Sequence, residues 1–217
     1  MQTHSEENYL KKIYQLGQNS MDKVSATALS HALGINPASV IDMLKKLANK
    51  KLIEYDKVNG TKLTNTGLAI SLLTLRRHRL WEMFLQEKLG YSWDEVHDIA
   101  EQLEHVKDES LADRLDKFLG FPQFDPHGES IPDSKGQVPD INRKILKGVE
   151  VGKMCRVISV RDTSKAFLQY LRKLNIAIGV HIQVIEKIDF DGSFVIMIGN
   201  SEKITVSEKF TESILVD

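Results

Sequence analysis

The sequence predicts a mainly α protein with a small β component, in which helical regions precede a compact barrel. Three observations support this prediction. Apolar residues recur at helical spacing through much of the first 120 residues. Six Pro and Gly residues then fall between positions 121 and 140, a composition that regular elements do not tolerate. Five short strand-like runs with one helical segment among them follow, which is typical of a small barrel.

The first 50 residues contain the pattern of a helix-turn-helix. Ser5 is placed to cap a first helix, whose apolar positions extend to Leu16. Residues 24–47 then form a short helix, a turn at Gly34 and a second helix. Asn36 is expected to cap this second helix and Pro37 to occupy its first position, where the missing N–H costs nothing.

A predicted hairpin converts this motif into a winged helix-turn-helix. Two short extended runs flank the dipeptide Asn59-Gly60, which is a strong hairpin signal. The lysines of such a unit can reach phosphates, and Ser39 and Asp42 can contact base edges. The expected DNA-contacting residues are Asn36, Pro37, Ala38, Ser39, Asp42, Lys45, Lys46, Lys57 and Lys62. The alternatives are a helical hairpin used only for packing and a winged helix that binds protein.

Charge is distributed unevenly along a chain whose net charge is only −1. Residues 1–80 contain twelve Lys and Arg against six Asp and Glu, a net charge of +6. Residues 81–125 contain four basic residues against twelve acidic ones, a net charge of −8. Positive charge attracts phosphate backbones and concentrated carboxylates attract metal ions, so a DNA-binding region followed by a metal-binding region is expected.

The acidic region contains imidazoles and carboxylates at metal-ligand spacing. If residues 93–106 form one helix, His97, Glu101, Glu104 and His105 share a sector of roughly 100°. In the long helix predicted for residues 67–88, His78 and Glu82 are one turn apart. The alternative is a solvated helix face, with Glu104 pairing to Lys107 or Asp108 and with a surface hydrogen bond between His78 and Glu82. The remaining histidines are expected to be structural or solvated, namely His4, His31, His127 and His181.

Bulk features exclude some classes of protein. No apolar run approaches the ~20 residues of a membrane span, and the first residues lack the pattern of a secretory signal, so we expect a cytoplasmic protein without a membrane partner. Cys155 is the only cysteine, which excludes an intrachain disulfide and a thiolate zinc cluster. We expect it to be a small buried hydrophobe in a strand.

These elements, in this order, resemble the diphtheria toxin repressor family of iron- and manganese-dependent regulators. The resemblance covers nearly the whole chain, and its order and spacing are more specific than any single motif. The motifs that show it are Glu7-Asn8-Tyr9-Leu10 with Ile13-Tyr14, Arg77-His78-Arg79-Leu80, Val96-His97-Asp98 and Glu104-His105-Val106.

The resemblance implies a domain organisation. Residues 1–73 would form the winged-helix DNA-binding domain and residues 74–121 a helical dimerisation and metal-binding domain. Residues 122–147 would be a proline-rich linker, and residues 148–217 an SH3-like domain of the FeoA type.

The resemblance also implies two metal sites. The primary site would use Glu101, Glu104 and His105, with Asn8 from the first helix; the ancillary site would use His78, Glu82 and His97. Iron-sensing members have Met and Cys where Asn8 and Glu101 stand, and the loss of both sulfurs favours Mn²⁺, with Fe²⁺ as the second candidate. Members with a closely paired two-metal site have carboxylates where this chain has Asn8 and Lys11. A paired site of that type is therefore not expected here.

The function implied is metal-dependent transcriptional repression. A homodimer would bind palindromic, double-stranded operator DNA when Mn²⁺ or Fe²⁺ is sufficient, and so control metal-ion homeostasis. The alternative from another class is a winged-helix transcription factor that responds to an organic ligand and has no metal requirement. A metal-dependent hydrolase is the weakest of the three, because no separate nucleophile or general base accompanies the ligands. We therefore do not expect an enzyme.

Overall fold

The computed structural model describes residues 2–18, 23–139, 143–199 and 203–217. The chain divides into two compact units. The first unit comprises residues 1–78, 103–112 and 132–137, and the second comprises residues 79–102, 113–131 and 138–217. None of the helices within these described ranges is long and apolar enough to cross a membrane.

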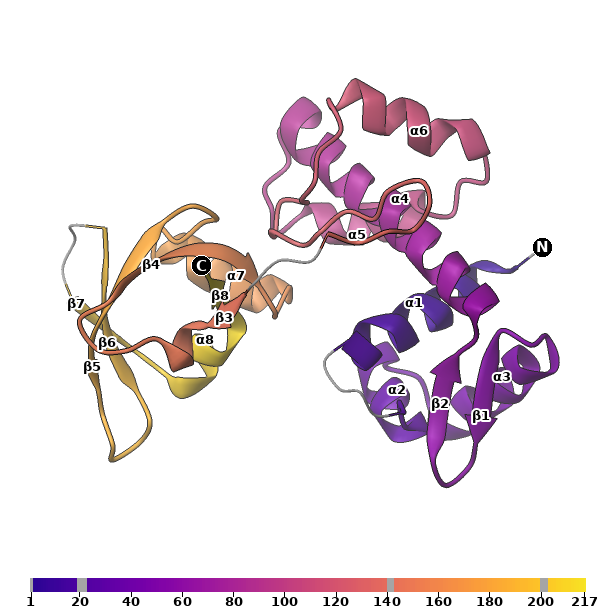
Figure 1. The fold of residues 1–217 in the computed structure, drawn as a ribbon, viewed down its shortest axis with the longest axis horizontal. Helices are drawn as coiled ribbons and strands as arrows, with labels where there is room; N and C mark the ends of the chain where they lie inside the picture. Colours follow the sequence, from indigo (N-terminus) through magenta and orange to yellow (C-terminus); the bar gives the residue numbers. More distant parts are fainter. Residues whose placement is uncertain (1, 19–22, 140–142, 200–202) are drawn as a thin grey trace. The chain divides into compact units, whose positions relative to one another are not determined.

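The first unit is built on a winged helix (Figure 1). Its elements are α1 (His4–Gln18), α2 (Ala26–Leu33), α3 (Pro37–Asn49), β1 (Ile53–Asp56), β2 (Gly60–Leu63) and the beginning of α4 (Asn65–Leu89). Leu10, Leu29, Val40, Leu44 and Leu47 are fully buried between the helices. The predicted helix-turn-helix and hairpin are thus confirmed.

Side-chain caps fix the helix boundaries of this unit. As predicted, the Asn36 carboxamide accepts a hydrogen bond from the Ser39 backbone N–H at 3.0 Å and the chain turns at Gly34, which adopts the left-handed conformation at φ 65°. The cap expected at Ser5 is wrong. Thr3 and Glu6 instead form a capping box, in which the Thr3 hydroxyl accepts from the Glu6 N–H and the Glu6 carboxylate accepts from the Thr3 N–H.

The hairpin has its turn where the sequence predicts it. The Asp56 carboxylate accepts hydrogen bonds from the backbone N–H groups of Val58 and Asn59, which closes the loop. Gly60 has φ 87°, and a Cβ there would lie 2.8 Å from the carbonyl oxygen of Val24. Only glycine therefore fits where the wing packs against the segment before α2.

Helix α5 (Val96–Leu103) is shorter than predicted. Glu104 and His105 lie in a turn beyond its end, so the expectation that His97, Glu101, Glu104 and His105 share one helical face is wrong. The Arg77 guanidinium donates to the Glu104 carbonyl, which supplies that carbonyl with a partner other than a helical N–H. The side chains of Glu104 and His105 thereby take directions that a continuous helix would not give them.

The second unit combines helices with an antiparallel sheet (Figure 1). Its helical part contains the end of α4, most of α5 and of α6 (Glu109–Phe118). The six-stranded sheet has the order β3-β8-β4-β5-β6-β7. Its strands are β3 (Lys144–Ile145), β4 (Met154–Val160), β5 (His181–Lys187), β6 (Phe194–Ile198), β7 (Lys203–Val206) and β8 (Ile214–Val216).

The sheet confirms five predicted strands and shows three elements that were not predicted. Helix α7 (Lys165–Lys173) matches the predicted helix of this domain. The unpredicted elements are β3, η1 (Leu146–Gly148) and α8 (Glu208–Ser213), each six residues or fewer. Segments this short have too little periodicity to be recognised. Cys155 is buried in β4 as expected, and burial raises its thiol pKa to about 11.

The proline-rich segment is more structured than a linker. Residues 140–142 of the predicted linker lie outside the described residues, and its last residues form β3 and the start of η1. Asp125, His127 and Ile131 are buried. Gly128 packs so closely on β4 that a Cβ there would lie 1.9 Å from the Ile158 carbonyl oxygen.

Candidate metal centre

The first cluster consists of Glu7, Lys11, His78, Glu104 and His105, all in the first unit. Glu104 is fully buried at its centre. The Lys11 ammonium lies 2.7 Å from both carboxylate oxygens of Glu104, and His78 Nδ1 lies 2.6 Å from Oε2. The predicted alternative, in which Glu104 pairs with Lys107 or Asp108 at the surface, is therefore not observed.

One ring nitrogen of His105 is hydrogen-bonded, and the other faces the interior of the cluster. Its Nδ1 lies 2.7 Å from the Glu7 carboxylate, so Nδ1 is the protonated nitrogen that donates. Its Nε2 is buried without a hydrogen-bond partner among the described residues and lies 3.7 Å from Glu104 Oε1. A carboxylate on one imidazole nitrogen, with the lone pair of the other directed inward, is the usual arrangement of a metal-binding histidine.

Helix α1 links this cluster to the recognition helix α3. Glu7 and Lys11 contact the cluster, whereas the neighbouring Glu6 is fully buried and accepts from Lys50 at 2.8 Å and from Lys46 at 3.0 Å. Burial opposes ionisation of Glu6, but the hydrogen bonds from the two lysines outweigh it and lower its pKa to about 2. Lys46, which was expected to contact DNA, is therefore engaged within the protein.

The second cluster consists of Glu82, Asp125 and His127, all buried and all in the second unit. Each offers a ligand atom, and the three atoms lie within 4.8 Å of one another. Burial and the nearby charge of Glu82 raise the pKa of Asp125 to about 6. Burial alone would lower the pKa of His127, but its hydrogen bond to Glu82 and the two carboxylate charges raise it to about 9. Both shifts reflect the two carboxylates gathered at this site, whose charges are balanced by the protonated imidazole of His127 and by Arg79.

A loop fixes the side chains of the second cluster. Asp125 Oδ1 accepts from the backbone N–H groups of His127 and Glu129 at 2.8 and 2.9 Å. His127 Nε2 donates to the carbonyl oxygen of Trp93 at 2.8 Å, and Nδ1 lies on the side of Glu82, 3.6 Å away. Nδ1 faces this carboxylate as a proton donor while the ring is protonated, and it would offer a lone pair to a metal ion after losing that proton. Arg79 lies 3.4 Å from the second oxygen of Asp125 and contacts Glu129, so the loop is held to α4.

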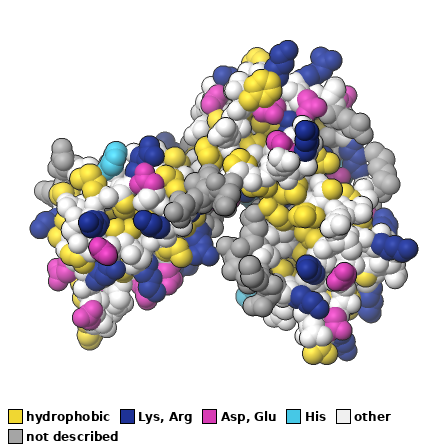
Figure 2. Space-filling model, viewed as in Figure 1, with side chains coloured by type: hydrophobic (Ala, Val, Ile, Leu, Met, Phe, Trp, Pro, Cys, Tyr) yellow, Lys and Arg dark blue, Asp and Glu magenta, His cyan; other side chains and the backbone are white. Residues whose placement is uncertain are grey.

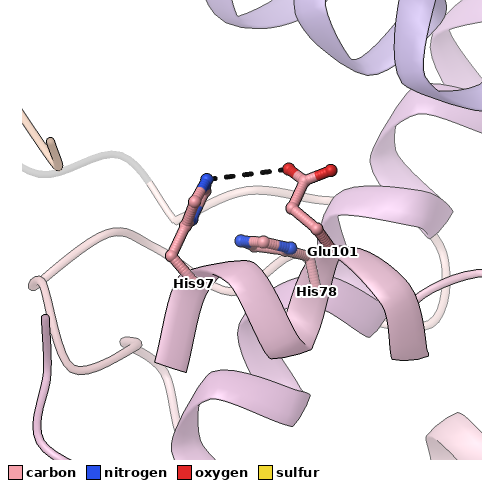
Figure 3. Close-up of side chains that lie close together, drawn as sticks. All are labelled: His78, His97 and Glu101. Atoms are coloured by element: carbon pink, nitrogen blue, oxygen red, sulfur yellow. Dashed lines mark ion pairs between the residues drawn. The ribbon is translucent and has the colours of Figure 1, made fainter. Parts of the chain in front are cut away.

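His97 and Glu101 lie beside the second cluster on α5. His97 Nδ1 is 3.2 Å from the other oxygen of Glu82, and His97 Nε2 is 3.7 Å from the Glu101 carboxylate. Figure 3 shows this pair on one face of α5, together with the side chain of His78. Both residues are partly exposed, unlike the three members of the second cluster.

The structure regroups the ligands expected from the sequence. Glu104 and His105 are together but are accompanied by His78, which was assigned to the ancillary site. Glu82 and His97 are together, and Glu101 pairs with His97. The Asn8 side-chain oxygen is buried without a hydrogen-bond partner among the described residues. Sequence reasoning missed Glu7, Asp125 and His127 as members of these clusters, and His127 was expected to be structural or solvated. Its only sequence signal was the Asp-x-His spacing within the proline-rich segment.

The chemistry of both clusters fits a divalent transition metal. The donors are carboxylate oxygens and imidazole nitrogens, which suit Mn²⁺, Fe²⁺ and Zn²⁺. The unpartnered Nε2 of His105 and the crowded carboxylates around Asp125 are both groups that a cation would satisfy.

The predicted DNA-contacting residues lie on one helix and one hairpin. All of those on α3 and the wing are exposed. Figure 2 shows Lys and Arg side chains on the surface around α3 and the β1–β2 hairpin. Asp42 and Lys45 form a loose pair at 3.6 Å, with both side chains largely exposed.

Models of three protein families match consecutive parts of the chain. Residues 1–61 match the N-terminal DNA-binding domain of iron-dependent repressors, and residues 64–133 match their metal-binding and dimerisation domain. Residues 145–217 match the FeoA domain. His78, Glu104, His105 and the whole second cluster fall in the metal-binding match.

Individual relatives agree with these matches. A solved manganese-dependent transcriptional repressor in complex with manganese is 34% identical, with a TM-score of 0.90, over 97% of this chain and 98% of that one. The regulator MntR of Oceanobacillus iheyensis is 29% identical over 69% of this chain and 99% of its own length. The iron-dependent repressor IdeR of Mycobacterium bovis is 31% identical over 58% of this chain.

That match to IdeR spans 54% of the relative's length, so the chain covers about half of it. The three family models, by contrast, follow one another along almost the whole of this chain in the order of its predicted domains. The chain therefore belongs to the family of iron- and manganese-dependent transcriptional repressors.

Proposed function

We propose that this protein is a metal-dependent transcriptional repressor, and that the two clusters are its metal-binding sites. The observation that carries the proposal is the second cluster, where three buried side chains offer ligand atoms within 4.8 Å of one another. Two buried carboxylates side by side are costly unless a cation compensates them. Glu82, Asp125 and His127 would hold this ion, with His97 beside them.

The first cluster would provide the second set of ligands. His105 Nε2 and the Glu104 carboxylate would face the ion, Glu7 would orient the imidazole, and Asn8 is a further candidate through its unpartnered oxygen. His78 approaches Glu104, and Glu101 extends the pair formed by His97 and Glu82. The residues expected to bind metal thus keep that role, but in regrouped sets.

Mn²⁺ is the preferred ion and Fe²⁺ the second candidate. The donors in both clusters are oxygen and nitrogen atoms, without thiolate or thioether, and such hard donors suit manganese. The solved repressor that is 34% identical to this chain is a complex with manganese, which supports the same choice.

Metal would act on DNA binding through helix α1. A bound cation would supply positive charge that joins the carboxylates and imidazoles of the first cluster. Glu7 on α1 would thereby be held against His105. The adjacent residue of α1, Glu6, forms ion pairs with Lys46 and Lys50 at the end of α3. Couplings of this kind are typically about 1–3 kcal/mol.

The proposed partner is operator DNA bound by a homodimer. The match of residues 64–133 to a dimerisation domain supports the dimer. Two winged helices related by twofold symmetry read palindromic half-sites about 34 Å apart, one turn of DNA. We place this regulator in the cytoplasm, where its DNA lies, and assign it no enzymatic activity.

The test is DNA binding with and without metal. Duplexes selected from a random library in the presence of Mn²⁺ would be used to measure affinity in Mn²⁺ and in chelator. We expect affinity to fall at least about tenfold in chelator, which corresponds to a coupling of about 1.4 kcal/mol. A selected duplex that binds equally well in chelator contradicts the proposal.

A second candidate is a winged-helix regulator that responds to an organic ligand. The observation that favours it is a cavity of about 980 Å³ in the second unit, a volume in the range of small-molecule sites. Its walls include Trp93, Phe124, Ile176 and Ile178, with Arg143 and Arg156. Equilibrium dialysis that finds no bound Mn²⁺ at micromolar concentration would favour this candidate over the first.

A further inference from the structure

We infer that the Lys11 ammonium is the built-in counter-cation of the first cluster. It holds α1 against Glu104 without any metal ion and prevents a second ion from binding to that carboxylate. The side chain of Lys11 is 2% exposed and that of Glu104 is fully buried, and the two come from positions 93 residues apart in the sequence.

The geometry gives Lys11 the place that a cation would take. Its Nζ lies 2.7 Å from each oxygen of Glu104, the position from which an ion could also contact both oxygens. An ion in that place, bound to both oxygens at the usual metal–oxygen distances of roughly 2.0 to 2.6 Å, would press against the ammonium. Two positive charges so close together in a buried site repel strongly. Metal binding to this cluster is therefore restricted to the side of His105 Nε2.

The ammonium also determines the position of the DNA-binding helices. Lys11 lies on α1, and Glu6 of the same helix accepts from Lys46 and Lys50 of the α3 end. The pair of Lys11 and Glu104 would therefore keep α1 and α3 in a fixed relation to the segment 103–112 before any metal arrives. Lys11 is therefore a positioning residue: its own contact with Glu104 needs no metal, and only the remaining donors of the cluster need an ion.

The first experiment measures thermal unfolding of the full chain in chelator. Lys11→Met leaves the Glu104 carboxylate buried without its cation, and we expect the midpoint temperature to fall by about 6 to 20 °C. Lys135→Met, at an exposed position of the same unit, is the control and should change the midpoint by no more than a few degrees.

A double variant keeps this test decisive if Lys11→Met is too unstable to study. Lys11→Met combined with Glu104→Gln removes both charges and should recover much of the stability lost by the single variant. A double variant as unstable as Lys11→Met overturns the inference, as does a Lys11→Met variant as stable as the control.

The second experiment counts bound ions and rests on the proposed function. Lys11→Glu replaces the ammonium by a carboxylate facing Glu104 and His78, so equilibrium dialysis against Mn²⁺ should find one more ion per protomer than in the unsubstituted protein. An unchanged ion count overturns the exclusion of a second ion. If the unsubstituted protein binds no Mn²⁺, the proposed function fails, whereas the experiment in chelator still decides the structural role of Lys11.

Discussion

The two clusters use similar side chains but balance their charge differently. In the first cluster, the buried Glu104 faces the ammonium of Lys11 at 2.7 Å from both oxygens. In the second, Glu82 and Asp125 lie close together, and burial and the charge of Glu82 raise the pKa of Asp125 to about 6. Arg79 is 3.4 Å from Asp125, too far to match the contact that Lys11 makes. The first cluster is balanced by a lysine, whereas the second is balanced largely by a protonated imidazole, which can exchange its proton for a metal ion.

This difference assigns different roles to the clusters. A site that is already neutralised can form at any metal concentration, and its role is to hold helices together. A site whose carboxylates are balanced by a proton on an imidazole can exchange that proton for a metal ion, and ion binding then shifts the balance between states. We therefore expect the second cluster to dominate metal affinity and the first to transmit its effect to α1.

The largest expected effect comes from Glu82→Gln. This change removes a carboxylate shared by His97 and His127, so the second cluster loses a ligand and half of its negative charge. The affinity for Mn²⁺, followed by electron paramagnetic resonance of the free ion, should fall by more than about 100-fold, beyond the usual effect of an outer-shell residue. Glu87→Gln, on the exposed face of the same helix, is the control. Equal affinity in both variants would remove the second cluster from the proposal.

A smaller effect is expected from Glu7→Gln. Glu7 orients the His105 imidazole without belonging to the donors that face the ion. Loss of such an outer-shell partner typically weakens metal binding about 10- to 100-fold. Isothermal titration with Mn²⁺ should show this loss for the weaker of the two sites, while Glu54→Gln on the exposed wing leaves it unchanged. A loss confined to the tighter site would reverse the ranking of the clusters.

Glu6→Gln separates the helix contacts from metal binding. Because the pKa of Glu6 is lowered from 4.5 to about 2, its ion pairs stabilise the fold fully above pH 4.5 and progressively less as the pH falls towards 2. Urea unfolding at pH 7 should show a loss of about 1–2 kcal/mol, a modest value because Lys46 and Lys50 are half-exposed and screened by solvent.

The difference between Glu6→Gln and the unsubstituted protein should shrink as the pH is lowered from 4.5 to 2.5, since Glu6 is then protonated in the unfolded chain and must lose a proton to form its ion pairs in the folded protein. Asp42→Asn, at an exposed position of α3, is the control. A difference that stays constant over this range would exclude ionised Glu6 as its source.

The smallest expected effect comes from the wing. Lys62→Ala removes one exposed ammonium from the hairpin and should weaken operator binding only about threefold at moderate salt. The slope of log affinity against log salt should decrease by about 0.9, the value for one phosphate contact. Lys165→Ala in the C-terminal domain should leave the slope unchanged. A variant at position 62 with an unaltered slope would place the DNA contact elsewhere.

Local patterns in the sequence were sufficient for most elements. The Asn36 cap, the left-handed Gly34 and the Asn-Gly hairpin are each encoded within a few neighbouring residues, so the winged helix was predictable. The end of α5 was not, because an arginine 27 positions earlier binds the Glu104 carbonyl. Helical spacing assigned Glu101 and Glu104 to the same face, and the turn after Leu103 separated them.

The family, the winged helix and the set of imidazoles and carboxylates available for a metal can all be predicted from the order of the residues. Which of those side chains meet depends on the three-dimensional fold, because the contacts join residues far apart in the chain: Lys11 with Glu104, Glu7 with His105, and Glu82 with His127. Spacing along one helix predicts which side chains point the same way. It contains no information on which residues of a distant helix or loop will face them, and here those distant residues set the charge of each cluster.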